Sequence, residues 1–279
     1  MAAPSRQELD VSDRDAVERA FDSWPGGPPD VLVNAAAYNQ VDRCESDGAE
    51  AAMRVNGAGP GVLASVCEAV GTRLVHVSTD YVFSGEAAAP VPEDAVPSPR
   101  SVYGQSKLEG ERRVQEASPE AMIVRTSWVF GPGKNFVGAI LRQARLRRSG
   151  EVEGPLRVVD DQRGCPTYAA DLAEAIRTLV AASAPGGVYH WQNATDEADP
   201  GAPTWWDFAR AILDGADYPD LLIDRVSTAD IASPAPRPAY SVLSCERAVS
   251  HGARRRSWRE ALVAYLSSPD LAITLEMTS

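Results

Sequence analysis

The first half of the chain alternates short apolar runs with longer stretches in which small and apolar residues recur at helical spacing. The apolar runs are Asp30–Asn34, Leu74–Ser78 and Met122–Arg125, and the helical stretches are Glu50–Val70 and Tyr103–Glu116. Continuous apolar runs are typical of strands buried on both faces of a parallel sheet. Because crossovers between parallel strands are right-handed, the pattern predicts an α/β fold with a doubly wound parallel sheet.

The second half of the chain is less regular. The pattern predicts helices over 135–148, 170–182, 205–213 and 258–266, and strands over 156–159 and 188–191. Thr204 is a suitable N-cap for the third of these helices. The proline-rich segment 233–238 is expected to be an irregular arm, because proline disrupts both helix interiors and central strands. The residues after 266 are expected to form a loose tail.

The composition is that of a globular protein with a large core. Of 279 residues, 44% are apolar and 24% are charged, and no run approaches the roughly 20 apolar residues that cross a bilayer. Four widely spaced cysteines form no zinc or dithiol motif, so we predict no metal site, reduced thiols and a cytoplasmic location. The net charge of −12 argues against nucleic acid as a partner. No segment indicates a membrane partner either.

The sharpest chemical signal is a tyrosine and a lysine on one helical face. Tyr103 and Lys107 are four residues apart, which stacks their side chains one turn apart. A phenol with a pKa of about 10 needs a nearby positive charge to act as an acid-base catalyst at neutral pH. A solvent-exposed helix face is the alternative explanation of this spacing. The catalytic interpretation gains weight because Lys107 and Lys134 are the only lysines among 27 basic residues.

A second signal lies at the end of an apolar strand. Ser78 and Thr79 place two hydroxyls at the carboxyl end of the second predicted strand, where open α/β sheets bind their ligands. Such a hydroxyl can donate a hydrogen bond to a substrate carbonyl oxygen. The alternative is that these residues only begin a turn. The tyrosine and lysine that open the next helix favour the catalytic interpretation.

Several segments together resemble one protein family. They are Asn34–Ala37, Ser78–Phe83, Tyr103–Lys107, Arg125–Gly131, Asp161–Thr167, and Arg237–Pro238 with Ser241–Leu243. Their order and spacing are similar to those of dTDP-4-dehydrorhamnose reductases, members of the extended short-chain dehydrogenase/reductase family. The resemblance implies a Rossmann-like dinucleotide-binding domain over residues 1–134, to which residues 155–184 return. It also implies a smaller substrate-binding lobe built from residues 135–154 and 185–279.

The resemblance implies a reaction and a set of site residues. The reaction is reduction of a 4-keto nucleotide sugar, dTDP-4-dehydro-6-deoxy-L-mannose, by hydride transfer from NADPH or NADH. The implied catalytic residues are Thr79, Tyr103 and Lys107, with the tyrosine as the proton donor. The implied cofactor contacts are Asp10, Val11, Asn34, Ala35, Ala36, Tyr103 and Lys107. The implied substrate contacts are Ser78, Thr79, Asp80, Trp128, Asn135, Phe136 and Arg237. For Trp128, a place in the hydrophobic core is the alternative.

One part of the family pattern is not found before Asp10, namely a first strand followed by a Gly-rich turn and a helix. That turn holds the cofactor pyrophosphate at a helix N-terminus. We therefore expect the natural protein to begin upstream of Met1, since loss of this strand would expose an apolar edge along Asp30–Asn34. A chain that starts at Met1 is expected to bind cofactor weakly.

Two alternatives to an active reductase remain open at this point. The first is a non-catalytic binding or regulatory protein, because the fold is also similar to the regulatory subunit of methionine adenosyltransferase. The second is an inactive truncated reductase. Retention of the threonine, tyrosine and lysine favours the enzyme. The expected partner is a small nucleotide sugar, and a homodimer is an open alternative to a monomer.

Overall fold

A four-stranded parallel sheet forms the centre of the computed structural model, which describes residues 4–5, 7–195 and 201–277. Its strands, in spatial order, are β1 (Val31–Asn34), β2 (Arg73–Thr79), β3 (Met122–Thr126) and β7 (Gly187–His190). In this register Asn34 lies opposite His76, and Thr79 lies opposite Thr126. The predicted α/β class with a parallel sheet is confirmed, and each of the three strands predicted in the first half lies within two residues of its expected bounds.

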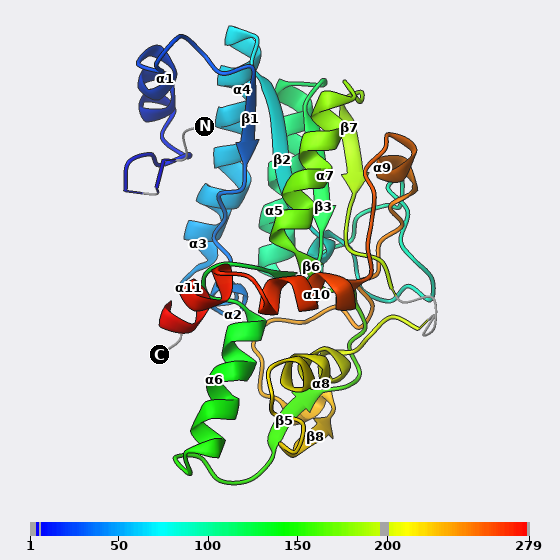
Figure 1. Ribbon diagram of the computed structural model, residues 1–279. Helices are drawn as coiled ribbons and strands as arrows, with labels where there is room; N and C mark the ends of the chain where they lie inside the picture. Colours follow the sequence, from blue (N-terminus) through cyan, green and yellow to red (C-terminus); the bar gives the residue numbers. More distant parts are fainter. Residues whose placement is uncertain (1–3, 6, 196–200, 278–279) are drawn as a thin grey trace.

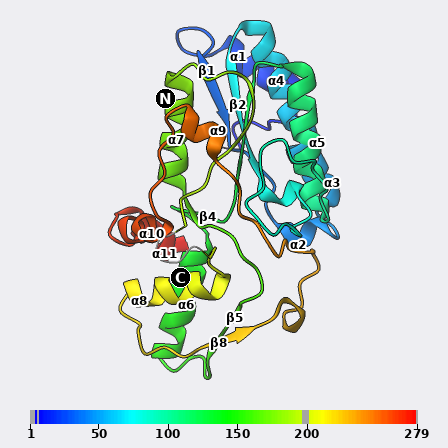
Figure 2. The ribbon, with the colours of Figure 1, turned by 90° about the vertical axis from the view of Figure 1, so that its right-hand side faces the viewer.

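Helices cover both faces of this sheet (Figures 1 and 2). On one face lie α1 (Arg14–Asp22), α4 (Gly59–Val70) and α5 (Val102–Ala117), and on the other lie α7 (Ala169–Ala181) and α9 (Glu246–Ser250). Strand residues alternate between the two resulting cores. Leu74 and Ile123 pack with α4 and α5, whereas Val75 and Val124 pack with α7. This arrangement explains why the strands read as continuous apolar runs.

The helix predicted over Glu50–Val70 contains a wider, π-helical turn. It consists of α3 (Ala49–Ala52), the π turn η1 (Met53–Ala58) and α4, and the short helix α2 (Val41–Cys44) precedes it. The buried amide of Asn56 lies in the π turn, where it accepts a hydrogen bond from Tyr38 N at 2.7 Å and donates one to Tyr38 O at 2.9 Å. Gly110 lets α5 approach this turn, since a Cβ there would lie 2.1 Å from Asn56 O.

A smaller lobe faces the carboxyl ends of the sheet strands (Figure 1). Its elements are α6 (Phe136–Arg148), β5 (Leu156–Val159), α8 (Trp205–Gly215), β8 (Ile223–Val226), α10 (Trp258–Leu266) and α11 (Asp270–Met277). Short elements near the boundary are η2 (Asp80–Val82), β4 (Val129–Phe130), β6 (Thr167–Tyr168) and η3 (Thr228–Asp230). Segment 233–238 belongs to no helix or strand, as predicted.

Strand pairing divides the chain differently from the boundaries expected in the sequence. Residues 155–184 were expected with the first domain, yet β5 pairs in parallel with β8 of the lobe. Residues 185–279 were expected in the lobe, yet β7 pairs in parallel with β3 of the central sheet. By strand pairing, β5 therefore belongs to the lobe and β7 to the central sheet, each the opposite of what the expected boundaries gave.

The expectation of a loose tail after residue 266 is wrong. Residues 270–277 form α11, whose Thr274 side chain is fully buried. The hydroxyl of Tyr265 donates a hydrogen bond to Gly131 O at 2.8 Å and also contacts the Thr274 hydroxyl. Leu271 and Leu275 pack against the aromatic core of the lobe. The side of α11 that carries these leucines thus holds the segment in place. The composition of residues 270–277 alone did not reveal this packing.

β1 is an edge strand in the part of the chain that the structure describes, and Val33 on it is 46% exposed. None of the described helices combines the length and the apolar character that crossing a membrane requires. All four cysteines are buried thiols.

Candidate active site

Buried polar residues gather at the carboxyl ends of β1, β2 and β3. Asn34, Ser78, Thr79 and Thr126 end these strands, and each is at most 7% exposed. Ser78 Oγ and Thr126 Oγ1 have no hydrogen-bond partner among the described residues. Unpartnered buried hydroxyls are costly, so this edge is suited to a polar ligand that supplies the missing partners.

Tyr103 lies at this edge because of how α5 begins. Ser101 caps the helix by accepting a hydrogen bond from Gly104 N at 3.0 Å. A Cβ at Gly104 would lie 2.2 Å from Tyr81 O, so only glycine allows this approach to η2. The rings of Tyr81 and Tyr103 meet edge to face with their centroids 5.4 Å apart. The tyrosine is thereby placed next to the residues that follow β2.

The Tyr103 phenol lies beside the Thr79 side chain. Burial raises the pKa of Tyr103, the nearby Asp80 carboxylate raises it further, and the neighbouring Thr79 hydroxyl opposes the rise. Thr79 also donates a hydrogen bond to Asp80 Oδ1 at 2.9 Å. The phenol is therefore protonated at neutral pH, the state that a proton donor requires.

Asp80 is a buried carboxylate beside these hydroxyls, with 3% of its surface exposed. Burial raises its pKa to about 6, although the neighbouring hydroxyls of Ser241 and Thr79 favour the ionised form. The Ser241–Leu243 segment thus reaches the site from the C-terminal half of the chain.

Lys107 lies one turn further along the same face of α5 and is 2% exposed. Its Nζ donates a hydrogen bond to Val77 O at 2.8 Å and lies 3.4 Å from His76 Nε2. Burial lowers the pKa of Lys107 to about 8, and Glu111 on the same helix opposes this change. The lysine is buried against β2, so the exposed-face alternative for the tyrosine–lysine spacing does not hold.

The expected cofactor residues occupy two places. Ala35 and Ala36 follow β1 and are exposed at the strand-end edge, beside the buried Asn34. Asp10 and Val11 lie near η1 and α4 instead. The carboxylate of Asp10 accepts hydrogen bonds from Ser12, which lower its pKa to about 2 with a further contribution from Arg54, 2.7 Å away.

Val11 packs closely on the helix that follows η1. A Cβ at Gly59 would lie 3.0 Å from Val11 Cγ2, and Val11 borders the core between α1 and α4. Its side chain therefore helps to anchor the segment that carries Asp10.

Trp128 is held between the sheet and the lobe. Its φ of 48° is unusual for a residue other than glycine, and its ring stacks on Trp205 with centroids 3.6 Å apart and planes 12° apart. Phe136 contacts Trp205 in turn, at 4.6 Å between centroids. Gly164 makes room for the ring, since a Cβ there would lie 2.4 Å from it. Trp128 is partly buried and packs against the hydrophobic core of the lobe, as the core alternative expects.

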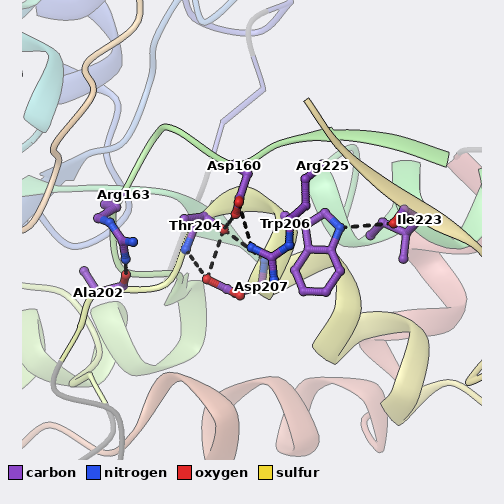
Figure 3. A network of polar contacts seen from close by, with 8 residues as sticks. All are labelled: Asp160, Arg163, Ala202, Thr204, Trp206, Asp207, Ile223 and Arg225. Atoms are coloured by element: carbon purple, nitrogen blue, oxygen red, sulfur yellow. Dashed lines mark hydrogen bonds and ion pairs between the residues drawn. The ribbon is translucent and has the colours of Figure 1, made fainter. Parts of the chain in front are cut away.

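A polar network fixes the helix that carries Trp205 (Figure 3). Thr204 and Asp207 form a capping box at the start of α8, and Asp160 accepts a hydrogen bond from the Thr204 hydroxyl at 2.7 Å. Asp160 also pairs with Arg225 at 2.7 Å, and Arg225 lies over the ring of Trp206. Thr204 is the N-cap that the sequence predicted.

The side chain of Asn135 is engaged in hydrogen bonds within the protein. Asn135 caps α6, accepting hydrogen bonds from Val137 N and Gly138 N, while its Nδ2 donates to the carbonyl oxygens of Gly131 and Gly133.

The Arg237 guanidinium pairs with Asp42 at 2.8 Å and donates a hydrogen bond to the Tyr81 hydroxyl at 3.1 Å. The proline-rich arm is thus tied to η2, directly beside the ring that contacts Tyr103.

A family model described as the RmlD substrate-binding domain matches residues 1–270. The chain belongs to this family. The dTDP-4-dehydrorhamnose reductase of Mycobacterium tuberculosis is 41% identical over 276 residues, which cover 96% of this chain and 85% of that protein. The family resemblance read from the sequence is confirmed.

Solved structures of this RmlD family have the same fold. A dTDP-4-dehydrorhamnose reductase from Clostridium acetobutylicum matches with a TM-score of 0.85 and 34% identity, covering 94% of this chain and 88% of that one. The Bacillus anthracis dTDP-4-dehydrorhamnose reductase, solved in complex with NADP, matches with a TM-score of 0.84 and 33% identity over 94% of this chain and 88% of that one.

In this member of the RmlD family, a second buried polar cluster lies below the site. Arg125 and Glu111 are 4% and 2% exposed, and Arg125 Nη2 lies 2.7 Å from Glu111 Oε2. His190 Nε2 lies 3.4 Å from Arg125, and the ring of Phe83 faces the guanidinium at 5.0 Å. This cluster ties α5, which carries the tyrosine and lysine, to β3 and β7.

Sequence reasoning assigned no role to His76 or Trp205. His76 is fully buried between Asn34 and Lys107, and its place in β2, two residues before Ser78, is the signal that could have revealed it. Trp205 follows the N-cap Thr204, and its contact with Trp128 joins positions 77 residues apart, which no local pattern predicts.

Proposed function

We propose that this chain reduces dTDP-4-dehydro-6-deoxy-L-mannose to dTDP-L-rhamnose, or a related dTDP-4-keto sugar to its dTDP-L-sugar, with NADPH. The observation that carries the proposal is the placement of Tyr103 at the strand-end edge, against Tyr81 and one helical turn from the buried Lys107. The names of the relatives and the NADP complex of the Bacillus anthracis reductase support it.

The residues at the strand ends fit the nicotinamide end of this cofactor. Ser78 Oγ and Thr126 Oγ1 lack partners among the described residues, and Ala35 and Ala36 leave their backbone accessible after β1. Lys107 supplies a donor for ribose hydroxyls. When bound there, NADPH supplies a hydride for the carbonyl carbon of the sugar.

Tyr103 completes the reduction by moving one proton. Its O–H bond breaks and a new O–H bond forms on the substrate oxygen, so hydride and proton together convert the ketone into an alcohol. Thr79 lies beside the phenol, and its hydroxyl, which donates to Asp80 Oδ1 in this structure, can turn to donate to the same carbonyl oxygen. The phenolate left behind is stabilised by a positive charge on Lys107. Because the pKa of Tyr103 is raised, the phenol stays protonated until it transfers its proton to the substrate.

The lobe supplies the contacts to the nucleotide sugar. Trp128 and Phe136 offer an apolar surface to the sugar ring. Arg237, at the edge of the site on the proline-rich arm, suits the diphosphate. Ser78 and Asp80 contribute hydrogen bonds beside Thr79, and Asn135 acts by fixing the start of α6.

We extend the proposal to domain roles and context. The region around the central sheet binds the dinucleotide through Asn34, Ala35, Ala36 and the Asp10–Val11 segment, and the smaller lobe binds the sugar. The four buried thiols fit the cytoplasmic location that we propose. A homodimer remains part of this proposal and is checked by light scattering.

The proposal is tested by following nicotinamide absorbance with the dTDP-4-keto sugar as substrate. Tyr103→Phe is expected to lower kcat/KM by about 10²- to 10⁴-fold, the usual contribution of a general acid. Tyr81→Phe is the matched control. It removes a different phenol hydroxyl at the same edge, one that accepts a hydrogen bond from Arg237. A Tyr103→Phe enzyme that stays folded by circular dichroism and turns over like the control would contradict the proposal.

A further inference from the structure

Three buried polar side chains form a chain across β1, β2 and α5 below the site. Asn34 Nδ2 lies 3.1 Å from His76 Nδ1, and His76 Nε2 lies 3.4 Å from Lys107 Nζ. The three residues are 4%, 0% and 2% exposed, so water does not compete for these contacts. Lys107 takes part in the proposed reduction, whereas His76 has no role in it.

The orientation of the Asn34 amide is fixed by the backbone of the loop after β1. Ala36 N donates a hydrogen bond to Asn34 Oδ1 at 3.1 Å, which identifies that atom as the carbonyl oxygen. The opposite side of the amide, which faces the histidine, is therefore the NH₂ group. Turning the amide over would place two donors, Ala36 N–H and the NH₂ group, against each other.

The amide in turn determines which ring nitrogen of His76 carries the proton. An NH₂ group only donates, so His76 Nδ1 must accept and must lack a proton. The proton of the neutral ring is then on Nε2. Burial and the neighbouring Lys107 hold the pKa of His76 well below its ordinary value, so the ring is neutral throughout the physiological range.

The N–H of this tautomer points at the nitrogen of Lys107. A charged ammonium has three donors and no acceptor, so it would oppose the imidazole N–H. A neutral amine has a lone pair that accepts from Nε2–H while one of its own hydrogens stays on Val77 O, 2.8 Å away. We propose that, before any ligand binds, Asn34 and His76 are positioning residues that favour the neutral amine of Lys107.

The other charged groups near this lysine do not share that effect. On α5, Glu111 favours the ammonium, but its carboxylate is engaged by Arg125 from β3. From η1 the neighbouring polar group is the uncharged Asn56, while Arg54 is paired with Asp10. Tyr103, on the same helix face, stays neutral because burial raises its pKa. Burial acts in the same direction as the proposed effect of the histidine and lowers the pKa of Lys107 to about 8.

The consequence is that the charge of Lys107 depends on the loop after β1. The Ala36 N–H orients the amide, so a ligand that shifts the backbone of Asn34–Ala36 would release the histidine tautomer and allow the ammonium. The link to catalysis rests on the proposed reductase function, in which this loop lines the cofactor. The tautomer and the lysine pKa do not depend on that function.

Nuclear magnetic resonance of the whole chain without added ligand tests the proposal. The chain has three histidines and two lysines, so ¹⁵N-histidine labelling gives the tautomer of His76, and ¹³Cε-lysine labelling of a Lys134→Arg chain follows Lys107 alone. We expect His76 protonated on Nε2 at pH 7. A ring protonated on Nδ1 in the wild-type chain would overturn the proposal without any further variant.

Asn34→Asp tests the causal link to the lysine. A carboxylate accepts from both Ala36 N–H and the ring, so the proton moves to Nδ1 and Nε2 becomes an acceptor for the ammonium. We expect the midpoint of Lys107 to rise by about one pH unit, a tenfold gain in proton affinity. Asn39→Asp, exposed on the same loop, controls for added charge. An unchanged midpoint, or an equal rise in the control, would overturn the proposal, whereas missing sugar reduction would count only against the proposed function.

Discussion

The two regions that border the strand-end edge are built from opposite kinds of side chain. Where α5 meets the sheet, the space is filled by Lys107, His76, Glu111 and Arg125, all at most 4% exposed. In the lobe, the space is filled by aromatic rings, with Trp128 stacked on Trp205. Buried polar groups hold protons and charges at fixed atoms, whereas rings supply apolar area with little loss of side-chain entropy. The difference matches the proposed division between proton transfer and sugar binding.

The regions also differ in what loss of one partner would cost. At the α5 interface each polar group depends on its neighbours, because a buried charge without a partner is strongly destabilising. In the lobe each ring touches several others, so removal of one leaves area uncovered but no unpaired charge. The comparison therefore predicts large losses of stability in the first region and moderate losses of affinity in the second.

The largest expected effect is on stability, from Glu111→Gln. This substitution leaves the guanidinium of Arg125 buried beside His190 without a carboxylate, and we expect the free energy of unfolding to fall by about 3–5 kcal/mol. Urea denaturation followed by circular dichroism measures it. The loss appears in the protein without ligand, because the ion pair connects α5 to β3 independently of any substrate.

Glu109→Gln provides the matched control on the same helix. Glu109 pairs with Arg113 at 2.7 Å, but the two side chains are 30% and 48% exposed, so solvent screens the pair. Its loss is expected to cost less than about 1 kcal/mol. Equal costs for the two substitutions would show that burial does not distinguish these ion pairs, and the contrast between the two regions would then fail.

The sequence predicted the first of these regions better than the second. The strands and α5 follow from local periodicity, and the tyrosine–lysine spacing identifies a helix face without any knowledge of tertiary contacts. What the spacing could not show is where the lysine nitrogen points. The contact with His76 depends on the register of β2 against α5, which is a long-range property.

In the lobe, local patterns gave the helices but not their mutual contacts. The N-cap Thr204 is readable because capping is local, whereas the stack of Trp128 on Trp205 requires β4 and α8 to be folded together. The same reason explains the wrong expectation for residues 270–277, whose helix depends on the distant Tyr265 and Gly131. The pairing of β5 with β8 was equally invisible to local periodicity.

The second prediction concerns affinity and uses Trp205→Ala. This change removes the ring that supports Trp128, whose backbone is held at a positive φ. If the two rings present apolar surface to the sugar, KM for the nucleotide sugar should rise about 10- to 100-fold, equivalent to about 1–3 kcal/mol. The kcat value should change little, because the proton donor lies in the other region. Steady-state kinetics at saturating cofactor separates the two constants.

Trp206→Ala is the control for that measurement. Trp206 follows Trp205 in α8, but its ring lies under Arg225 and its Nε1 donates to Ile223 O at 3.3 Å (Figure 3). Its loss should reduce stability and leave KM near the wild-type value. A rise in KM that is the same for both substitutions would assign the effect to a general loosening of α8 and not to the stacked rings.

The smallest expected effect belongs to Asn135, whose amide already satisfies the start of α6. Asn135→Ala removes the cap from two backbone N–H groups, and we expect the free energy of unfolding to fall by about 1 kcal/mol. Asn135→Asp keeps an oxygen for Val137 N but loses the NH₂ group that donates to Gly133 O at 2.9 Å. Recovery of most of the lost stability in the aspartate variant would assign the effect to the cap.

Because both ends of the Asn135 amide are engaged within the protein, KM for the nucleotide sugar should stay within about twofold in either variant. A twofold change in KM corresponds to less than about 0.5 kcal/mol of binding free energy. A large rise in KM without a loss of stability would instead show that Asn135 binds the sugar nucleotide directly, and the separation between support and contact in the lobe would have to be redrawn.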